Sequence, residues 1–143
     1  VETALADVLV AFDPEHLRRV MVNLLDNAKR YASTRADAMV VSTGAAPSGQ
    51  AILSIWSDGD PLDQSIERNL FEPFFSSESR SSGLGLYICR ELCDGHGATI
   101  AYQRSRRFVR GQELDGNEFF ITFRPSRRES DGSRQSDKMP LEP

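Results

Sequence analysis

The sequence predicts an α+β fold, a two-layer sandwich in which helices cover one face of a mixed β-sheet. Three observations carry this prediction. A long helical pattern lies near the start of the chain, two strand patterns follow it, and a second helical pattern precedes two further strand patterns. With 143 residues, of which 39% are hydrophobic, the chain is long enough to fold as one domain with a sizeable core.

The first helix is expected to begin after an extended stretch at residues 2–12. Asp13 suits the N-cap position and Pro14 the first helical position, and the pattern continues to about Ser33. Apolar residues at helical spacing predict which side of this helix is buried: Leu17, Val20, Met21, Leu24, Leu25 and Ala28.

A pair of strands should follow the first helix. Residues 36–43 and the alternating residues 51–57 are typical of strands, and the segment 44–50, GAAPSGQ, is typical of the turn between them. The breaker cluster that begins at Asp58 ends the second strand. Residues 62–82 show no sustained period and are expected to be irregular.

The second half of the domain is expected to hold one helix and two strands. The helix should run from about Leu84 to Cys93, and the strands should cover residues 98–103 and 117–124. Between the strands we expect a loop or hairpin bend that carries Arg104, Arg106, Arg107 and Arg110. The domain then occupies residues 1–124, and the polar residues 125–143 are expected to form a disordered tail.

Composition limits the classes of partner. The net charge of −4 and the pI near 5.2 do not favour binding to nucleic acid, and the arginine cluster at 104–110 is a single run that acidic residues offset overall. No apolar run approaches the roughly 20 residues needed to span a bilayer. Cys89 and Cys93 lack the further ligands of a zinc site, so they are expected to be reduced core residues.

Three groups of residues point to a nucleotide site. Asn23, Asn27 and Arg30 share one side of the first helix, where amide oxygens suit Mg²⁺ and the guanidinium suits phosphate. Tyr31 offers an aromatic face for a base. Taken alone, this group is better explained as ordinary surface residues of a helix.

The second group is Asp58-Gly59, directly after a strand. A carboxylate there can accept a hydrogen bond from an exocyclic amine, and glycine lets a planar base approach the backbone. The third group, at 82–86, comprises Ser82, Gly83, Leu84, Gly85 and Leu86 at the start of a helix, where backbone N–H groups and the helix dipole attract phosphate. Taken alone, Asp58-Gly59 is explained by an ordinary strand-to-loop turn, and residues 82–86 by a helix start that happens to need glycine. The order and chemistry of the three groups together indicate a Mg-ATP site.

With these residues in place, the chain resembles the ATP-binding domain of sensor histidine kinases, in the larger group of gyrase, chaperone and mismatch-repair ATPases. The N box, G1 box, F box and G2 box of that family are similar to the segments HLRRVMVNLLDNAKRYA, WSDGDPLD, LFEPFF and SSGLGLYICRELCDGHGATI. The resemblance covers residues 13–124. It is greater to nitrogen-regulatory and type IV pilus sensor kinases than to the osmosensor type.

The resemblance implies a role for each matching position. Asn27 would bind Mg²⁺ with Asn23 beside it, Arg30 would meet the phosphates, and Tyr31 would pack by the adenine. Asp58 would accept the adenine amino group, and Gly83 and Gly85 would form the phosphate loop. Residues 62–82 would form a mobile ATP lid anchored by Phe71, Phe74 and Phe75. His96 matches a structural position of the family, and His16 lacks the surroundings of a phosphoacceptor.

The resemblance also implies partners and a setting. The domain would bind Mg-ATP and donate the γ-phosphate to a histidine on a separate dimerisation domain. A downstream response regulator would then receive the phosphoryl group from that histidine. It would be the cytoplasmic portion of a sensor that can be membrane-bound, and on its own it would be monomeric. An ATPase of the gyrase or chaperone type is disfavoured, because those enzymes carry a general-base Glu where this chain has Asn23.

Two departures from the family pattern leave an alternative open. The G1 pattern expects glycines at positions 60 and 62, which here are Asp60 and Leu62, and Ser81 stands at the first glycine of the G2 pattern. The alternative is a degenerate nucleotide-binding or partner-binding module with weak or no ATP binding.

Overall fold

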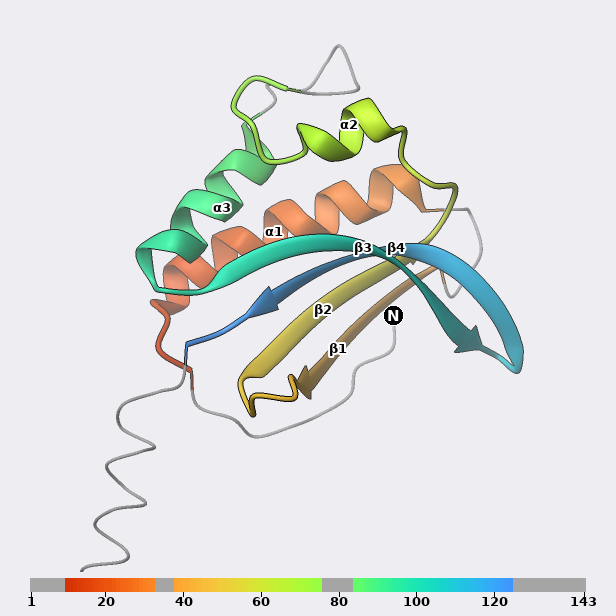
Figure 1. Ribbon diagram of the computed structural model, residues 1–143, viewed down its shortest axis with the longest axis horizontal. Helices are drawn as coiled ribbons and strands as arrows, with labels where there is room; N and C mark the ends of the chain where they lie inside the picture. Colours follow the sequence, from red (N-terminus) through yellow and green to blue (C-terminus); the bar gives the residue numbers. More distant parts are fainter. Residues whose placement is uncertain (1–9, 33–37, 76–83, 125–143) are drawn as a thin grey trace, which may run out of the picture.

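The computed structural model describes residues 10–32, 38–75 and 84–124. Figure 1 shows how their elements are arranged, with two longer helices packed side by side over a curved sheet. The elements in chain order are α1 (Pro14–Tyr31), β1 (Met39–Ala45), β2 (Ala51–Asp58), α2 (Gln64–Arg68), α3 (Gly85–Gly95), β3 (Thr99–Val109) and β4 (Gln112–Thr122).

The strands form one four-stranded sheet in the order β1-β2-β4-β3. Every pairing between these strands is antiparallel, so the expected mixed sheet is wrong for the described residues. The reason is the connectivity. β1–β2 and β3–β4 are hairpins, and β4 turns back between β2 and β3, which would otherwise be parallel neighbours. Of the stretch 2–12, expected to be extended, only residues 10–12 are described.

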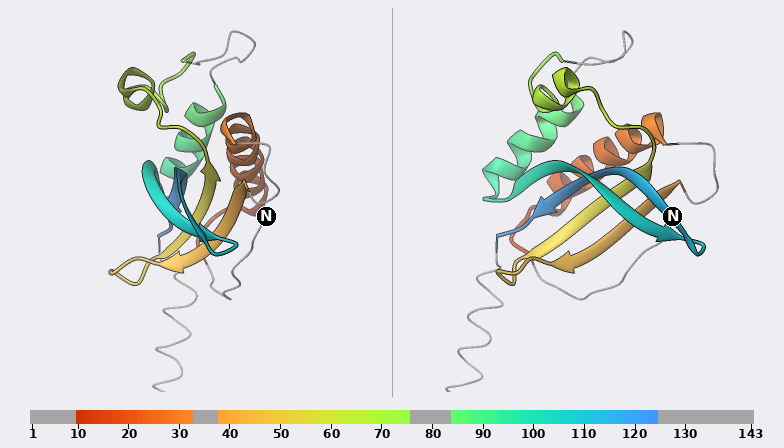
Figure 2. Two further views of the ribbon diagram at one scale, coloured as in Figure 1. Left: turned by 90° about the vertical axis from the view of Figure 1, so that its right-hand side faces the viewer. Right: turned by 45° about the vertical axis from the view of Figure 1, so that its right-hand side comes forward.

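The helices α1 and α3 cover one face of the sheet, which confirms the predicted two-layer α+β sandwich (Figure 2). Two contacts show that these helices run antiparallel. The Cys89 thiol in the middle of α3 lies 3.7 Å from the Val20 carbonyl oxygen of α1. The ring of His96, just after α3, lies 5.2 Å from that of His16, near the start of α1. Cys89 and Cys93 are free, fully buried thiols in this core, as predicted. Among the described residues no helix is long and apolar enough to cross a membrane.

The opposite face of the sheet is closed by the long β3–β4 hairpin. Trp56 of β2 is 0% exposed, and its indole N–H donates to the Ser105 carbonyl oxygen at 3.2 Å. Gly116 of β4 lies so close that a Cβ there would sit 2.4 Å from the indole. The hairpin therefore shields the tryptophan, which pairs across the sheet with Val40.

The arginine segment belongs to this hairpin and is not a loop, which corrects the sequence prediction. β3 continues to Val109 and β4 begins at Gln112, so that of the arginines only Arg110 lies in the turn. Cross-strand pairing explains the extension, because Arg106 meets Asp115 at 2.8 Å and Glu113 at 3.9 Å. The sequence prediction looked for apolar residues at alternate positions. This part of β3 has charged residues instead, which pair with charged residues across the hairpin.

The remaining boundaries shift by a few residues. The helix α1 ends at Tyr31, and α3 continues to Gly95, two residues past the expected end. The short helix α2 lies within the segment expected to be irregular, where five residues are too few to show a helical period. The predicted tail, residues 125–143, lies outside the described residues.

Candidate functional site

The helix α1 places its polar residues beside the buried side, as predicted. Asp13 accepts hydrogen bonds from the backbone N–H groups of Glu15 and His16 at 2.9 and 3.2 Å and fixes the start of the helix. From that start, Val20, Leu24 and Ala28 fall in the core. Asn23 and Asn27 are half-buried at its border, and Arg30 is exposed in the last turn. The side chain of Tyr31 is not among those that the structure describes.

Asn23 faces the start of α3. Its side-chain oxygen lies 3.8 Å from the point that a Cβ on Gly85 would occupy. The structure therefore brings together two motifs that are 62 positions apart in the sequence (85 − 23). Leu84 occupies the N-cap position and offers no side-chain oxygen to the first turn, and Leu86 is half-buried in that turn. The predicted phosphate residues Ser82 and Gly83 lie outside the described residues.

Asn27 carries an unusual polar group one turn further along α1. Its amide nitrogen is buried and has no hydrogen-bond partner among the described residues. Buried amide groups are almost always hydrogen-bonded, so such a group calls for an acceptor beyond the described residues. A phosphate oxygen or a metal-bound water is such an acceptor, and the amide oxygen of the same side chain suits Mg²⁺. The residues therefore fit Mg-ATP.

Asp58 ends β2 at the same end of the molecule (Figure 1). It is only 6% exposed, and its backbone N–H donates to the Ala38 carbonyl oxygen at 2.8 Å. Across the sheet it pairs with Gly116. Gly59 follows with a φ of +148°, a conformation that residues with a side chain rarely adopt. Asp58 is therefore a buried residue at a strand end with glycine after it, and its base-reading role stays a prediction.

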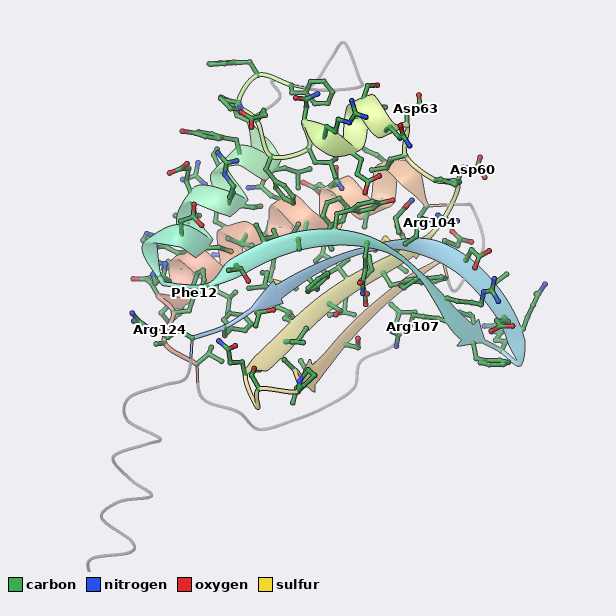
Figure 3. The ribbon with its side chains drawn as sticks, in the orientation of Figure 1. Phe12, Asp60, Asp63, Arg104, Arg107 and Arg124 are labelled. Carbon is green, nitrogen blue, oxygen red and sulfur yellow. The ribbon has the colours of Figure 1, made fainter. Side chains whose placement is uncertain are left out.

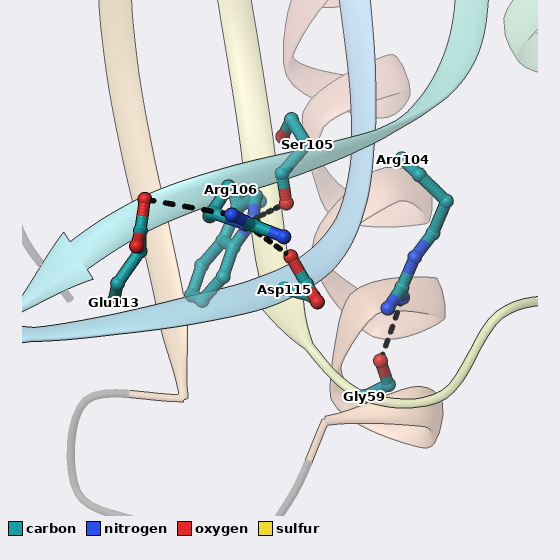
Figure 4. Close-up of polar contacts among 7 residues, drawn as sticks. Gly59, Arg104, Ser105, Arg106, Glu113 and Asp115 are labelled. Atoms are coloured by element: carbon teal, nitrogen blue, oxygen red, sulfur yellow. Dashed lines mark hydrogen bonds and ion pairs between the residues drawn. The ribbon is translucent and has the colours of Figure 1, made fainter.

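The turn after Asp58 is held by three side chains that sequence reasoning missed. Arg104 donates to the Gly59 carbonyl oxygen at 2.6 Å (Figure 4). The Asn117 amide nitrogen donates to the Asp60 carbonyl oxygen at 3.0 Å. Figure 3 labels Arg104 and Asp60 in this part of the molecule. The Tyr102 hydroxyl donates to the Asn117 amide oxygen. Burial raises the pKa of Tyr102, against the opposing effects of the Leu62 backbone and Arg104. These residues come from β3 and β4, and only the antiparallel register reveals them.

The phenylalanines after α2 differ in their surroundings. Phe71 packs edge-on against Phe119 at a centroid distance of 6.3 Å, so it anchors this segment as predicted. Phe75 is half-buried. Phe74 is 79% exposed, so the prediction that it anchors the segment is wrong. Its backbone also has a φ of +61°, in the left-handed region that residues with a side chain rarely adopt.

His96 has a structural setting, in line with the prediction. Its ring stacks on Phe12 at 4.0 Å, and its Nδ1 lies 2.7 Å from the Leu92 carbonyl oxygen. It lies at the end of α3 away from Gly85 and the site residues, beside the start of α1.

A family model described as the histidine kinase-, DNA gyrase B-, and HSP90-like ATPase matches residues 12–128. The chain belongs to this family. The sensor protein kinase PilS of Pseudomonas aeruginosa is 35% identical over 125 residues, which are 85% of this chain and 22% of that protein. The histidine-protein kinase AtoS of Escherichia coli is 33% identical over 88 residues, 62% of this chain and 14% of that protein.

A solved structure supports the same family assignment. The catalytic domain of the histidine kinase ThkA aligns with a TM-score of 0.67 at 27% identity and covers 85% of this chain and 74% of that chain. Together with the relatives, it shows that this is a histidine-kinase-type ATP-binding catalytic domain. The chain spans about a fifth or less of the length of these two curated relatives.

Proposed function

We propose that this domain binds Mg-ATP and donates the γ-phosphate to a histidine on a separate dimerisation domain of the same sensor, from which a response regulator is then phosphorylated. One observation carries the proposal. The side-chain oxygen of Asn23 faces Gly85 at the start of α3, and the amide nitrogen of Asn27, which has no partner among the described residues, lies buried one turn further along α1. These groups would supply the oxygen ligands and N–H donors that a divalent cation and a polyphosphate require.

The residues would divide the work as follows. Asn27, with Asn23 beside it, would hold Mg²⁺, and Arg30 would pair with phosphate oxygens from the last turn of α1. The backbone at Ser82, Gly83, Leu84, Gly85 and Leu86 would cradle the phosphates. Asp58 would read the adenine amine with Gly59 beside it, and Tyr31 and Phe74 would flank the nucleotide. Bound Mg²⁺ would neutralise phosphate charge, so that catalysis is mainly positioning.

Asn23 favours a kinase over an ATPase. A side-chain amide cannot accept a proton from water, so this position does not provide the general base that hydrolysis uses. A domain that binds ATP without activating water keeps the γ-phosphate for an acceptor histidine. Replacement of Asn23 by Glu supplies a carboxylate at that point, and we expect the variant to hydrolyse ATP faster than the parent domain. An unchanged rate of phosphate release would contradict this assignment.

The proposal is tested by mixing the domain and Mg-ATP with the histidine-bearing helical domain of its own receptor. We expect acid-labile phosphorylation of the helical domain, and none when its histidine is replaced by Gln. The alternative, a degenerate nucleotide- or partner-binding module, predicts weak or no nucleotide binding and no transfer. It rests on Asp60, Leu62 and Ser81. One observation favours it, because the Leu62 side chain packs against the core where the family pattern has glycine.

A further inference from the structure

The turn that follows Asp58 departs from the family pattern at two points and is unusually well held. Asp60 and Leu62 occupy the positions at which the G1 pattern has glycine. Glycines give a backbone freedom that these residues lack. In their place, the turn accepts hydrogen bonds on its own backbone from side chains of the β3–β4 hairpin.

Asn117 is the centre of this network. It is 3% exposed, and its amide nitrogen donates to the Asp60 carbonyl oxygen at 3.0 Å. Its amide oxygen accepts from the Tyr102 hydroxyl and from Arg104, the latter at 3.2 Å. Both ends of the Asn117 amide are therefore satisfied, and its orientation is fixed.

Arg104 also reaches the turn itself. Its guanidinium donates to the Gly59 carbonyl oxygen at 2.6 Å, a short charge-assisted bond that Figure 4 shows. Tyr102 acts on the turn through Asn117, whose amide oxygen accepts from the tyrosine hydroxyl. Positions 59 and 60 of the turn are thus each tied to the hairpin, immediately after the carboxylate that would read the base.

We propose that Arg104, Tyr102 and Asn117 are positioning residues for the nucleotide: they fix the 59–62 turn and thereby the placement of Asp58 against adenine. The inference rests on the proposed function, since it assumes a bound nucleotide. The inference goes beyond the proposed function by assigning base specificity in part to the β3–β4 hairpin. The hairpin restrains, by side-chain hydrogen bonds, a turn to which the family pattern gives two glycines.

Arg104→Gln tests the proposal, with Arg106→Gln as its matched control. Both arginines are exposed on β3 and both variants lose one positive charge, so the net charge of the domain changes equally. Arg106 pairs with Asp115 and Glu113 of β4, away from the turn. Affinities for Mg-ATP and Mg-GTP would be measured by calorimetry, and amide hydrogen exchange would be measured at Asp60 and Leu62.

We expect Arg104→Gln to bind Mg-ATP roughly fivefold more weakly than Arg106→Gln, about the effect of one charge-assisted hydrogen bond at an exposed site. We also expect its ratio of ATP to GTP affinity to fall and its turn amides to exchange faster. Arg104→Lys should recover part of each loss, because the ammonium can still donate to Gly59. A purely structural role would leave the ATP to GTP ratio unchanged.

Tyr102→Phe provides a second variant that keeps the ring packed against Phe119, whereas replacing the buried Asn117 risks unfolding. It should speed amide exchange at Asp60 and lower the same ratio, because Asn117 loses one of the two donors that fix its amide. Equal affinities and ratios in the Arg104 and Arg106 variants of a domain that binds ATP would overturn the positioning role alone. A parent domain that binds no nucleotide would overturn the proposed function, and the positioning role with it.

Discussion

Gly116 provides a sharp test of how the hairpin closes over the sheet. A Cβ at this position would lie 2.4 Å from both the Ser57 carbonyl oxygen and the Trp56 ring, far inside van der Waals contact. The oxygen belongs to the backbone of the central strand β2, and the ring is 0% exposed, so neither can move aside without disturbing the sheet. Gly116→Ala should therefore strain the pairing between β2 and β4.

The expected loss of stability follows from this crowding. Overpacking of a buried site costs typically about 1–3 kcal/mol, and a rigid backbone neighbour places Gly116→Ala at the upper end. The backbone entropy advantage of alanine offsets about 0.5–1 kcal/mol of this. We expect a net decrease of about 2–3 kcal/mol in the free energy of unfolding, and a melting temperature lower by about 10 °C.

Urea unfolding followed by tryptophan emission measures this directly, because Trp56 is the single tryptophan of the chain and contacts the substituted position. Gly44→Ala is the control, since Gly44 lies in β1 and a Cβ added there would have no described atom within 4 Å. It should stay within about 0.5 kcal/mol of the parent or be slightly more stable. A Gly116→Ala domain as stable as the parent would refute the reasoning.

Three further predictions concern the site and the core. Asn27→Asp should weaken Mg-ATP binding in calorimetry, because it adds negative charge beside the triphosphate, whereas Gln112→Glu, with the same added charge at the hairpin tip, should not; equal affinities in the two variants would argue against the metal role. Asp58→Asn should lower the ratio of ATP to GTP affinity, and equal binding of ATP and GTP by the parent would undercut the base-reading role. Burial raises the pKa of the Cys89 thiol to about 12 and that of Cys93 to about 11, from an ordinary 9.0. The unfolded thiols ionise first as the pH rises, so stability should be full below about pH 9 and fall from there towards pH 12; a Cys89→Ala variant with the same alkaline loss would contradict this.

Local patterns were enough to predict much of the fold. Asp13 with Pro14 marked the start of α1, and periodicity gave its buried side, because both signals lie within a few residues of each other in the chain. The extent of β3 and β4 could not be predicted in this way. Their charged residues are satisfied by partners across the hairpin, such as Arg106 with Asp115, and this pairing depends on register.

The residues of the candidate site also fall into those that local sequence predicts and those that only the fold reveals. Asn23, Asn27 and Asp58 were predicted because their chemistry follows from local spacing, and the structure adds that Asn23 faces Gly85. The network around Asn117 could not be predicted, since its residues come from strands that begin 40 and 53 residues after Gly59 in the chain (99 − 59 and 112 − 59). Phe74 is exposed and has a left-handed backbone, and the sequence around this position predicts neither feature.

The most direct test of the Mg-ATP site is a calorimetric titration of the parent domain with Mg-ATP, repeated without Mg²⁺ and with the Asn27→Asp variant. We expect saturable heat for the parent, weaker binding without the cation, and weaker binding by the variant. No heat with the folded parent domain, or an affinity indifferent both to Mg²⁺ and to the charge at Asn27, would contradict the claim that this is a working Mg-ATP site.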